Sequence, residues 1–286
     1  MKLSLHDKYI QQISPNIYAF IQGPHITNSG FVVFSWGVIV IDSLMTLTLA
    51  NRLKRAIRSV TDKPIKYVVN THFHGDHVFG NQCFLPASIV GHKNTALTLE
   101  RNGQIYVTKF AQRFPKLETE LTKVRVIPPT LTFQNSIRLG TLDEGVDLFF
   151  FGHGHTSGDI VLFCPQEKVL FAGDLVFHAI CPTSDDAHIS SWLTVLERLE
   201  ELDSQVIIPG HGDPCGRREL GYMQQLLREV LASSKSITFG HEGTSDALKN
   251  ILGIGITETR YARWLYPERI MGLVEKAQAV DGKKYD

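Results

Sequence analysis

Hydrophobic and polar positions along this chain follow two different spacings. Short runs rich in β-branched and aromatic residues, bounded by Gly, Asn or Pro, predict strands. Such runs lie at residues 16–22, 30–35, 38–42, 66–71, 88–91, 123–127, 131–133 and 146–151, and a hairpin is predicted over residues 160–171. Longer stretches with apolar residues three or four positions apart predict amphipathic helices. Because the two kinds of element alternate, the pattern predicts a protein of the α/β class.

The clearest helical spacing lies in residues 46–60, where Leu53 and Ile57 share one stripe and the basic residues lie mostly off it. Residues 189–202 show the same spacing. A mostly helical insertion is predicted over residues 94–114, and it is rich in aromatic side chains. These aromatic residues have two interpretations: they pack in the core, or they form a wall of a substrate pocket.

One short run concentrates candidate metal ligands. Residues 72–77 have the sequence HFHGDH, which follows a predicted strand and precedes a short helix predicted over residues 78–84. The run supplies three imidazoles and one carboxylate, from His72, His74, Asp76 and His77. Both groups are good ligands for zinc or iron. The spacing therefore predicts a metal-binding loop of the kind found in hydrolases.

The geometry of an extended chain gives a first idea of how this loop is used. Side chains two positions apart share a side, so His72, His74 and Asp76 would converge while His77 would point elsewhere. One loop could then serve two metal ions. Gly75 would let the backbone turn tightly between the second histidine and the aspartate.

Three further polar motifs follow the first in a fixed order. They are GHTSGD at residues 154–159, FAGD at 171–174 and PGHG at 209–212. Together with THFHGDH at residues 71–77, this ordered set resembles the metallo-β-lactamase superfamily. The resemblance runs from about residue 28 to residue 213. It implies a four-layer αββα sandwich, whereas the periodicity alone predicts only α/β. The resemblance leaves the last seventy or so residues unassigned, and their apolar spacing predicts a helical C-terminal tail.

The resemblance also implies a ligand set for two metal ions. One ion would be held by His72, His74 and His155, and the other by Asp76, His77 and His211, with Asp174 bridging the two. The implied cofactor is two zinc ions, and iron or manganese could replace one or both.

Three polar residues near the motifs stay outside this ligand set. His153 lies two positions before His155 and offers an alternative register for the third ligand, but the match of residues 155–156 to the family segment favours His155. Asp42 and Asp159 have two equal interpretations. They either orient ligands from behind or cap the ends of strands.

The implied chemistry is hydrolysis. Two ions about 3.5 to 4 Å apart can share a water whose pKa falls towards roughly 7, which provides hydroxide at neutral pH. The first metal would polarise a substrate carbonyl, and the second would stabilise the leaving group. Asp76 is the predicted catalytic residue, because it would orient the hydroxide and could carry its proton. No serine or cysteine nucleophile is needed.

Departures from familiar relatives narrow the substrate class. Asp174 stands where zinc β-lactamases commonly have Cys or Ser, so the site resembles glyoxalase II and the lactonases, and β-lactamase activity is disfavoured. Phe177 stands where quorum-quenching lactonases carry a tyrosine, and no glutathione-binding tail is recognisable. The extended segment 71–81 resembles a zinc hydrolase group associated with quinoprotein genes.

We therefore expect hydrolysis of an ester, thioester, lactone or amide by a zinc-dependent metallo-hydrolase. Two alternatives remain open at this stage. One is a mononuclear iron dioxygenase acting on persulfide sulfur, which has a similar ligand run. The other is a promiscuous, weak β-lactamase or a nucleic-acid-processing hydrolase.

Composition bears on the partners of this protein. The 286 residues contain 29 Lys and Arg and 29 Asp and Glu, so no broad field favours nucleic acid or an anionic membrane. The predicted partner is a small-molecule substrate, with no nucleic acid and no membrane, and a homo-oligomer stays open. Four cysteines without CxxC spacing predict reduced thiols. The first residues contain no apolar leader, and we expect a cytoplasmic protein.

Two domain-level units are predicted. Residues 10–235 would form the metallo-β-lactamase-like domain, and residues 236–286 a helical C-terminal extension that packs on the same domain. In this extension Arg260 and Arg263 could reach an acidic substrate, but a solvated helix face is the simpler interpretation.

Overall fold

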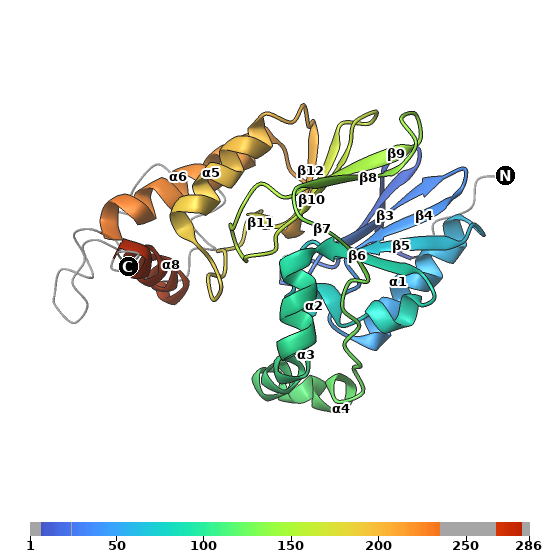
Figure 1. Cartoon of the computed structure of the whole chain (residues 1–286), viewed down its shortest axis with the longest axis horizontal. Helices are drawn as coiled ribbons and strands as arrows, with labels where there is room; N and C mark the ends of the chain where they lie inside the picture. Colours follow the sequence, from blue (N-terminus) through green and yellow to red (C-terminus); the bar gives the residue numbers. More distant parts are fainter. Residues whose placement is uncertain (1–6, 24, 235–266, 282–286) are drawn as a thin grey trace.

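The computed structural model describes residues 7–23, 25–234 and 267–281. Two β-sheets form the centre of the molecule (Figure 1). The first contains seven strands, in the spatial order β1 (Ile10–Ser14), β2 (Ile17–Phe20), β3 (Ser29–Phe34), β4 (Gly37–Ile41), β5 (Ile65–Val69), β6 (Ser88–His92) and β7 (Leu131–Phe133). The second contains five, in the order β12 (Val206–His211), β11 (Val169–Phe177), β10 (Val161–Cys164), β9 (Gly145–Phe149) and β8 (Ser136–Gly140).

Helices cover the outer face of each sheet. Beside the first sheet lie α1 (Leu47–Val60), α2 (Gly75–Val78), η1 (Asn81–Phe84), α3 (Lys93–Arg113), η2 (Pro115–Leu117) and α4 (Glu118–Leu121). Beside the second lie α5 (Ile189–Glu200), α6 (Arg217–Ser234) and α8 (Pro267–Asp281). The arrangement is the four-layer αββα sandwich that the motifs imply, and C-terminal helices are present.

The connections explain the mixed sheets. Strands β1 to β4 are antiparallel neighbours, whereas β4, β5, β6 and β7 run parallel to one another. Parallel neighbours need long crossovers, and α1 and α3 provide them on the outer face. Strand β12 likewise runs parallel to β11, after the crossover helix α5. The first motif follows the carboxyl end of β5, the second precedes β10, the third lies within β11 and the fourth closes β12.

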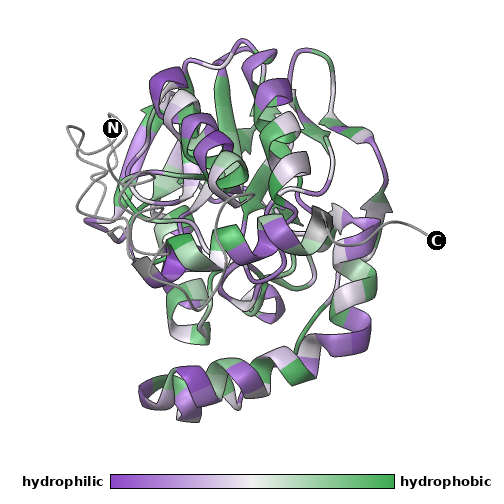
Figure 2. Ribbon diagram, turned by 90° about the vertical axis from the view of Figure 1, so that its left-hand side faces the viewer, coloured by the Kyte–Doolittle hydropathy of each residue, from purple (hydrophilic) through white to green (hydrophobic). Residues whose placement is uncertain are grey.

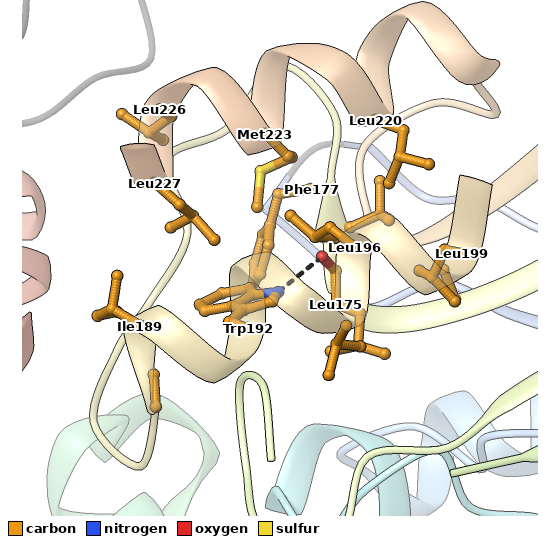
Figure 3. Close-up of a cluster of buried hydrophobic side chains, with 14 of the residues drawn as sticks. Leu175, Phe177, Ile189, Trp192, Leu196, Leu199, Leu220, Met223, Leu226 and Leu227 are labelled. Carbon is orange, nitrogen blue, oxygen red and sulfur yellow. Dashed lines mark hydrogen bonds between the residues drawn. The ribbon is translucent and has the colours of Figure 1, made fainter. Parts of the chain in front are cut away.

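Separate apolar layers hold the sandwich together. Between the sheets, side chains of both pack into one cluster that includes Val32, Ile41, Leu148 and Phe171. Outside the second sheet, Trp192 of α5 is fully buried, and its Nε1 donates a hydrogen bond to the Leu175 carbonyl at 3.0 Å (Figure 3). Figure 2 shows mainly hydrophobic strands behind helices of mixed hydropathy. Burying a large aromatic side chain while satisfying its polar atom stabilises this layer strongly.

Several sequence predictions are confirmed and a few are wrong. Helix α1 begins as predicted, because the Thr46 side chain accepts a hydrogen bond from the Leu49 amide at 3.2 Å. The strand predicted over residues 123–127 is absent from the structure. Its apolar residues pack under α3 instead, and its backbone pairs with the side chains of Asn81 and Gln82 rather than with a strand. The edge strands β1 and β8 were not predicted, because their residues alternate only weakly between buried and exposed.

The C-terminal part is described only in α8. This helix packs on α6 and α5, with Ile270, Leu273 and Val274 fully buried. The predicted boundary at residues 235–236, and Arg260 and Arg263, lie outside the described residues. In the part of the chain that the structure describes, no helix combines the length and apolar character that crossing a membrane requires.

Candidate metal centre

The predicted ligands meet at one edge of the sandwich. They come from the loop after β5, the loop before β10, the middle of β11 and the end of β12. Their donor atoms form two groups, each spanning at most 4.8 Å: His72, His74, His155 and Asp174 in the first, and Asp76, His77 and His211 in the second. The structure thus brings together all seven residues that the motifs indicate, and their role as ligands stays a prediction.

In the first group, two imidazoles face each other directly. Nδ1 of His74 lies 2.9 Å from Nε2 of His155, which in turn lies 3.4 Å from Oδ2 of Asp174. Nε2 of His72 is 3.9 Å from the same oxygen. The outer nitrogens of these rings are engaged elsewhere. Nε2 of His74 bonds Oδ2 of Asp186 at 2.9 Å, and Nδ1 of His155 bonds the Thr183 carbonyl at 3.2 Å.

The second group adjoins the first through Asp174. Its Oδ1 lies 3.2 Å from Nε2 of His77, and its Oδ2 lies 3.6 Å from Nε2 of His211. Oδ2 of Asp76 lies 3.4 Å from the same His211 nitrogen. The hydroxyl of Thr27 donates a hydrogen bond to that Asp76 oxygen at 2.5 Å. Asp174 therefore stands between the two groups, within reach of both.

The local backbone explains the grouping and corrects one expectation. The prediction that His72, His74 and Asp76 share a side is wrong, because the chain stops being extended after His74. It enters the single helical turn α2, so Asp76 joins His77 rather than His72. Gly75 is required by close packing: a Cβ there would meet the Phe79 ring at 2.3 Å.

The helix predicted over residues 78–84 is also displaced. Its first turn lies at Gly75–Val78, within the ligand run, and a 3₁₀ turn follows at Asn81–Phe84. Two aromatic residues of α3 pack in the apolar cluster beside the ligand loop. Tyr106 stacks on Phe73 of the ligand loop with centroids 6.0 Å apart, and Phe110 packs edge-on against Phe79.

Asp42 lies behind the second group. Its Oδ2 bonds Nδ1 of His77 at 2.7 Å and accepts a hydrogen bond from the Thr71 hydroxyl at 2.8 Å. Its Oδ1 accepts the Thr71 amide. The carboxylate therefore orients the His77 ring and fixes its outer nitrogen as the donor.

Asp159 and His153 form hydrogen bonds that hold the loop around His155, and neither bonds a donor atom of the two groups. Asp159 accepts hydrogen bonds from the Gly154 amide and from the amide and hydroxyl of Thr156. These bonds shape the turn that presents His155. Nε2 of His153 bonds the Asp186 carbonyl at 2.7 Å and lies outside both donor groups.

Thr27, Thr183 and Asp186 were missed by sequence reasoning. None belongs to a motif, and each approaches the centre only because the fold closes over it. Asn28 shows the same effect: its side-chain amide donates to the Pro209 and Gly212 carbonyls at 2.9 and 2.6 Å. The segment before β3 thereby fixes the end of β12, where His211 lies.

The donor set fits divalent cations. Nε2 of His72, Nε2 of His77 and Oδ1 of Asp174 are buried and have no hydrogen-bond partner among the described residues. Leaving such groups unpaired costs free energy, roughly 1 to 3 kcal/mol each. A cation between the two groups would satisfy these atoms. Imidazole nitrogens and carboxylate oxygens are ligands that zinc accepts.

The pKa shifts of the site residues in the metal-free protein also indicate a site that favours cations. Burial lowers the pKa of His155 to about 3 and places the pKa of His72 well below its usual value. Burial also lowers the pKa of His211, but the carboxylates of Asp174 and Asp76 outweigh it and raise this pKa to about 9. The pKa of His77 is raised well above its usual value for the same reason. The two carboxylates thus require nearby positive charge, which protons provide when metal is absent.

The chain belongs to the metallo-beta-lactamase superfamily, whose family model matches residues 22–211. It is 25% identical over 233 residues to a metallo-beta-lactamase type 2 of Bacillus cereus, which covers 77% of this chain and 82% of that protein. It is 24% identical to a linear primary-alkylsulfatase of a Pseudomonas species, covering 68% of this chain and 43% of that enzyme.

Solved structures show the same fold. The metallo-beta-lactamase from Pontibacter korlensis matches with a TM-score of 0.65 and 22% identity, covering 77% of this chain and 98% of that one. The superfamily includes metal-dependent hydrolases, and its members bind divalent metals, typically zinc. The protein is thus a superfamily member with a candidate metal site at His72, His74, His155 and Asp174.

Proposed function

We propose that this protein is a dinuclear zinc-dependent hydrolase that attacks the carbonyl of a small ester, thioester, lactone or amide. The observation that carries the proposal is the placement of Asp174 between two complete donor groups. Seven donor residues are more than one tetrahedral zinc site uses. A pair of ions sharing one carboxylate accounts for all of them.

The two donor groups and the residues behind them have different proposed roles. The first group, including Asp174, would hold one ion, and Asp76, His77 and His211 together with Asp174 would hold its neighbour. When bound, such ions polarise a carbonyl oxygen and lower the pKa of a coordinated water towards about 7. Asp42, Asp186 and the Thr183 carbonyl fix the tautomers of His77, His74 and His155, so that each of these three rings presents a lone pair inward.

Asp76 is the proposed catalytic residue. Its side chain is 22% exposed, whereas that of Asp174 is 4% exposed, so Asp76 reaches the open side of the centre. The hydrogen bond from Thr27 fixes the carboxylate. His77 and His211 hold its pKa well below the usual range despite burial, which keeps the carboxylate ionised. We infer that it accepts a hydrogen bond from the attacking water and orients that water towards the carbonyl.

The substrate class follows from Asp174 and from the balanced charge of the chain. A carboxylate at this position supports a site of the glyoxalase II or lactonase type, and the relatives named β-lactamases share the fold at about a quarter identity. Equal numbers of basic and acidic residues give no general attraction for a polyanion. We expect small uncharged or weakly charged carbonyl substrates, with β-lactams cut slowly at best.

A substrate panel at fixed zinc concentration tests this proposal. The panel would contain aryl and alkyl esters, thioesters, lactones, a β-lactam, a phosphodiester and RNA. We expect robust turnover of at least one carbonyl class and none of RNA. Robust ribonuclease or phosphodiesterase activity with negligible ester, thioester and lactone turnover would overturn the assignment.

A further inference from the structure

The segment that joins β11 to α5, residues 178–188, lies against the first donor group. It supplies two of the outer hydrogen-bond partners there. Oδ2 of Asp186 bonds Nε2 of His74 at 2.9 Å, and the Thr183 carbonyl bonds Nδ1 of His155 at 3.2 Å. These are the two imidazoles whose inner nitrogens face each other at 2.9 Å. One segment therefore sets the orientation of both rings.

Helix α8 holds this segment in place. The Arg269 guanidinium donates a hydrogen bond through Nη1 to the Cys181 carbonyl at 2.6 Å. Gly272 lies directly against Ser184, because a Cβ at this glycine would be 3.1 Å from the Ser184 hydroxyl. Cys181 and Ser184 are both buried. The contacts of α8 thus bracket Thr183 on both sides along the chain.

The apolar face of α8 continues this contact. Its residues Ile270, Leu273 and Val274 belong to the same buried cluster as Ile180 and Ala187 of the segment. Both ends of the segment are therefore anchored in a core that α8 completes. Helix α8 lies beyond residues 22–211, where the family model matches, so this support is supplied by a part of the chain outside the match.

We propose that α8 positions the first metal site: it fixes residues 181–186, and Asp186 and the Thr183 carbonyl of that segment orient His74 and His155. Asp186 is a positioning residue, since it acts through His74 Nε2 and leaves Nδ1 as the ligand atom. The inference rests on the proposed metal centre. The C-terminal helix α8 sets the metal affinity of the first site. The affinity of the second site does not depend on α8, because its His77 is oriented by Asp42.

The neighbouring Asp185 provides a matched control. Its side chain is 75% exposed and pairs with Arg113 at 3.8 Å, and it contacts neither imidazole. Asp186→Ala and Asp185→Ala therefore remove the same group from adjacent positions. Only the first removes an outer partner of a ligand. Asp186→Asn keeps an oxygen that can accept from His74 while removing the charge, and we expect it to restore part of the loss.

The experiment is a titration of the metal-free full-length chain with Zn²⁺ against a chromophoric chelator, repeated with Co²⁺ to follow the ligand-field spectrum. We expect Asp186→Ala to weaken one of the two sites by about 10- to 100-fold and to alter its cobalt spectrum, while the other site keeps its affinity. Asp185→Ala should match the unchanged protein. Equal zinc affinities and spectra for Asp186→Ala and the unchanged protein would overturn the positioning role.

The contribution of α8 is tested separately through Arg269. Arg269→Ala should weaken the same site as Asp186→Ala, by up to about tenfold. The control is Arg228→Ala in α6, which removes an exposed guanidinium that pairs with Glu197 of α5. If Arg269→Ala does not fold, judged by circular dichroism, Arg269→Lys is used, since its amine retains one donor for Cys181 and should give a smaller shift in the same site.

The outcomes separate this inference from the proposed function. Folded Arg269 variants with both sites unchanged, or with only the second site weakened, would overturn the role of α8. Two zinc ions bound normally by every variant would sink the inference and leave the proposed function standing. An unchanged protein that binds no zinc at all would overturn both.

Discussion

Nδ1 of His74 and Nε2 of His155 face each other at 2.9 Å, although the outer nitrogens of both rings already have partners in Asp186 and Thr183. If each outer nitrogen carries its proton, two lone pairs point at one another. Such a pair is stable only with a cation between or beside the nitrogens, either a proton or a metal ion. The first donor group is therefore arranged to accept a cation before any substrate arrives.

Metal binding should release protons at neutral pH. Burial lowers the pKa of His211, but Asp174 and Asp76 raise it to about 9, and the pKa of His77 is also raised, so both rings are protonated at pH 7 without metal. These protons must leave when the nitrogens coordinate an ion. Zinc affinity should accordingly rise with pH through about 9, the range in which His211 becomes neutral.

Proton release can be measured with a pH indicator in weakly buffered solution as zinc is added to the metal-free chain. His155, with a pKa of about 3, should contribute nothing above pH 5. Zinc binding that releases no protons at pH 7, or affinity that falls as the pH rises from 6 to 9, would show that the second group does not coordinate the ion.

Asp76→Asn should abolish most of the activity even if metal stays bound. The amide preserves the shape of the side chain and can still accept the Thr27 hydrogen bond, but it loses the charge that orients the attacking water. We expect kcat to fall by about 10² to 10⁴-fold. The matched control is Asp213→Asn, because Asp213 has an exposed side chain on the same edge. Full activity of Asp76→Asn with normal zinc content would contradict the proposed role.

Asp174→Ala should uncouple the two sites. This carboxylate is close to donor atoms of both groups, at 3.4 Å from His155 and 3.2 Å from His77. Its loss removes a ligand from each group, and the zinc content should fall from two ions towards one, retained by the His72, His74 and His155 imidazoles. Asp203→Ala, at an exposed surface pair with Lys168, serves as the control. A variant with two metals and full turnover would show that Asp174 is not the bridge.

Gly210→Ala should displace that same carboxylate from behind. A Cβ at residue 210 would lie 1.8 Å from Oδ1 of Asp174 and 2.8 Å from the Gly173 backbone. The carboxylate must move, so we expect weaker zinc binding and a loss of about 1 to 3 kcal/mol in the free energy of unfolding.

Urea unfolding of the metal-free chain and zinc titration measure the two effects of Gly210→Ala. Gly221→Ala in α6 is the control, since a Cβ there meets no atom within 4 Å. It should leave zinc binding unchanged and raise helix stability by up to about 1 kcal/mol. Equal zinc affinities and unfolding free energies for Gly210→Ala and Gly221→Ala would mean that the close packing of Gly210 against Asp174 does not hold this carboxylate in place.

Much of this centre could be predicted because its residues sit in four short motifs. Runs such as 72–77 carry their chemistry in consecutive letters, and the order of the motifs implies the fold. The grouping of Asp76 with His77 came only from the resemblance, since the extended-chain argument overlooked the helical turn that begins at Gly75.

The residues that support the ligands could not be predicted in the same way. Asp186 is 112 positions from His74, and Thr27 is 49 positions from Asp76, so their pairing depends on how the fold brings distant segments together. The strand prediction for residues 123–127 is wrong for a related reason. Its alternating valines suit a strand or a surface under a helix equally, and only the position of α3 decides between them.

The metal content of the full-length chain, purified without added metal and measured by elemental analysis, tests the central claim most directly. Two complete donor groups that share Asp174 predict two zinc or similar divalent ions per chain. One iron per chain, together with oxygen uptake on glutathione persulfide, would contradict the account and favour a mononuclear dioxygenase.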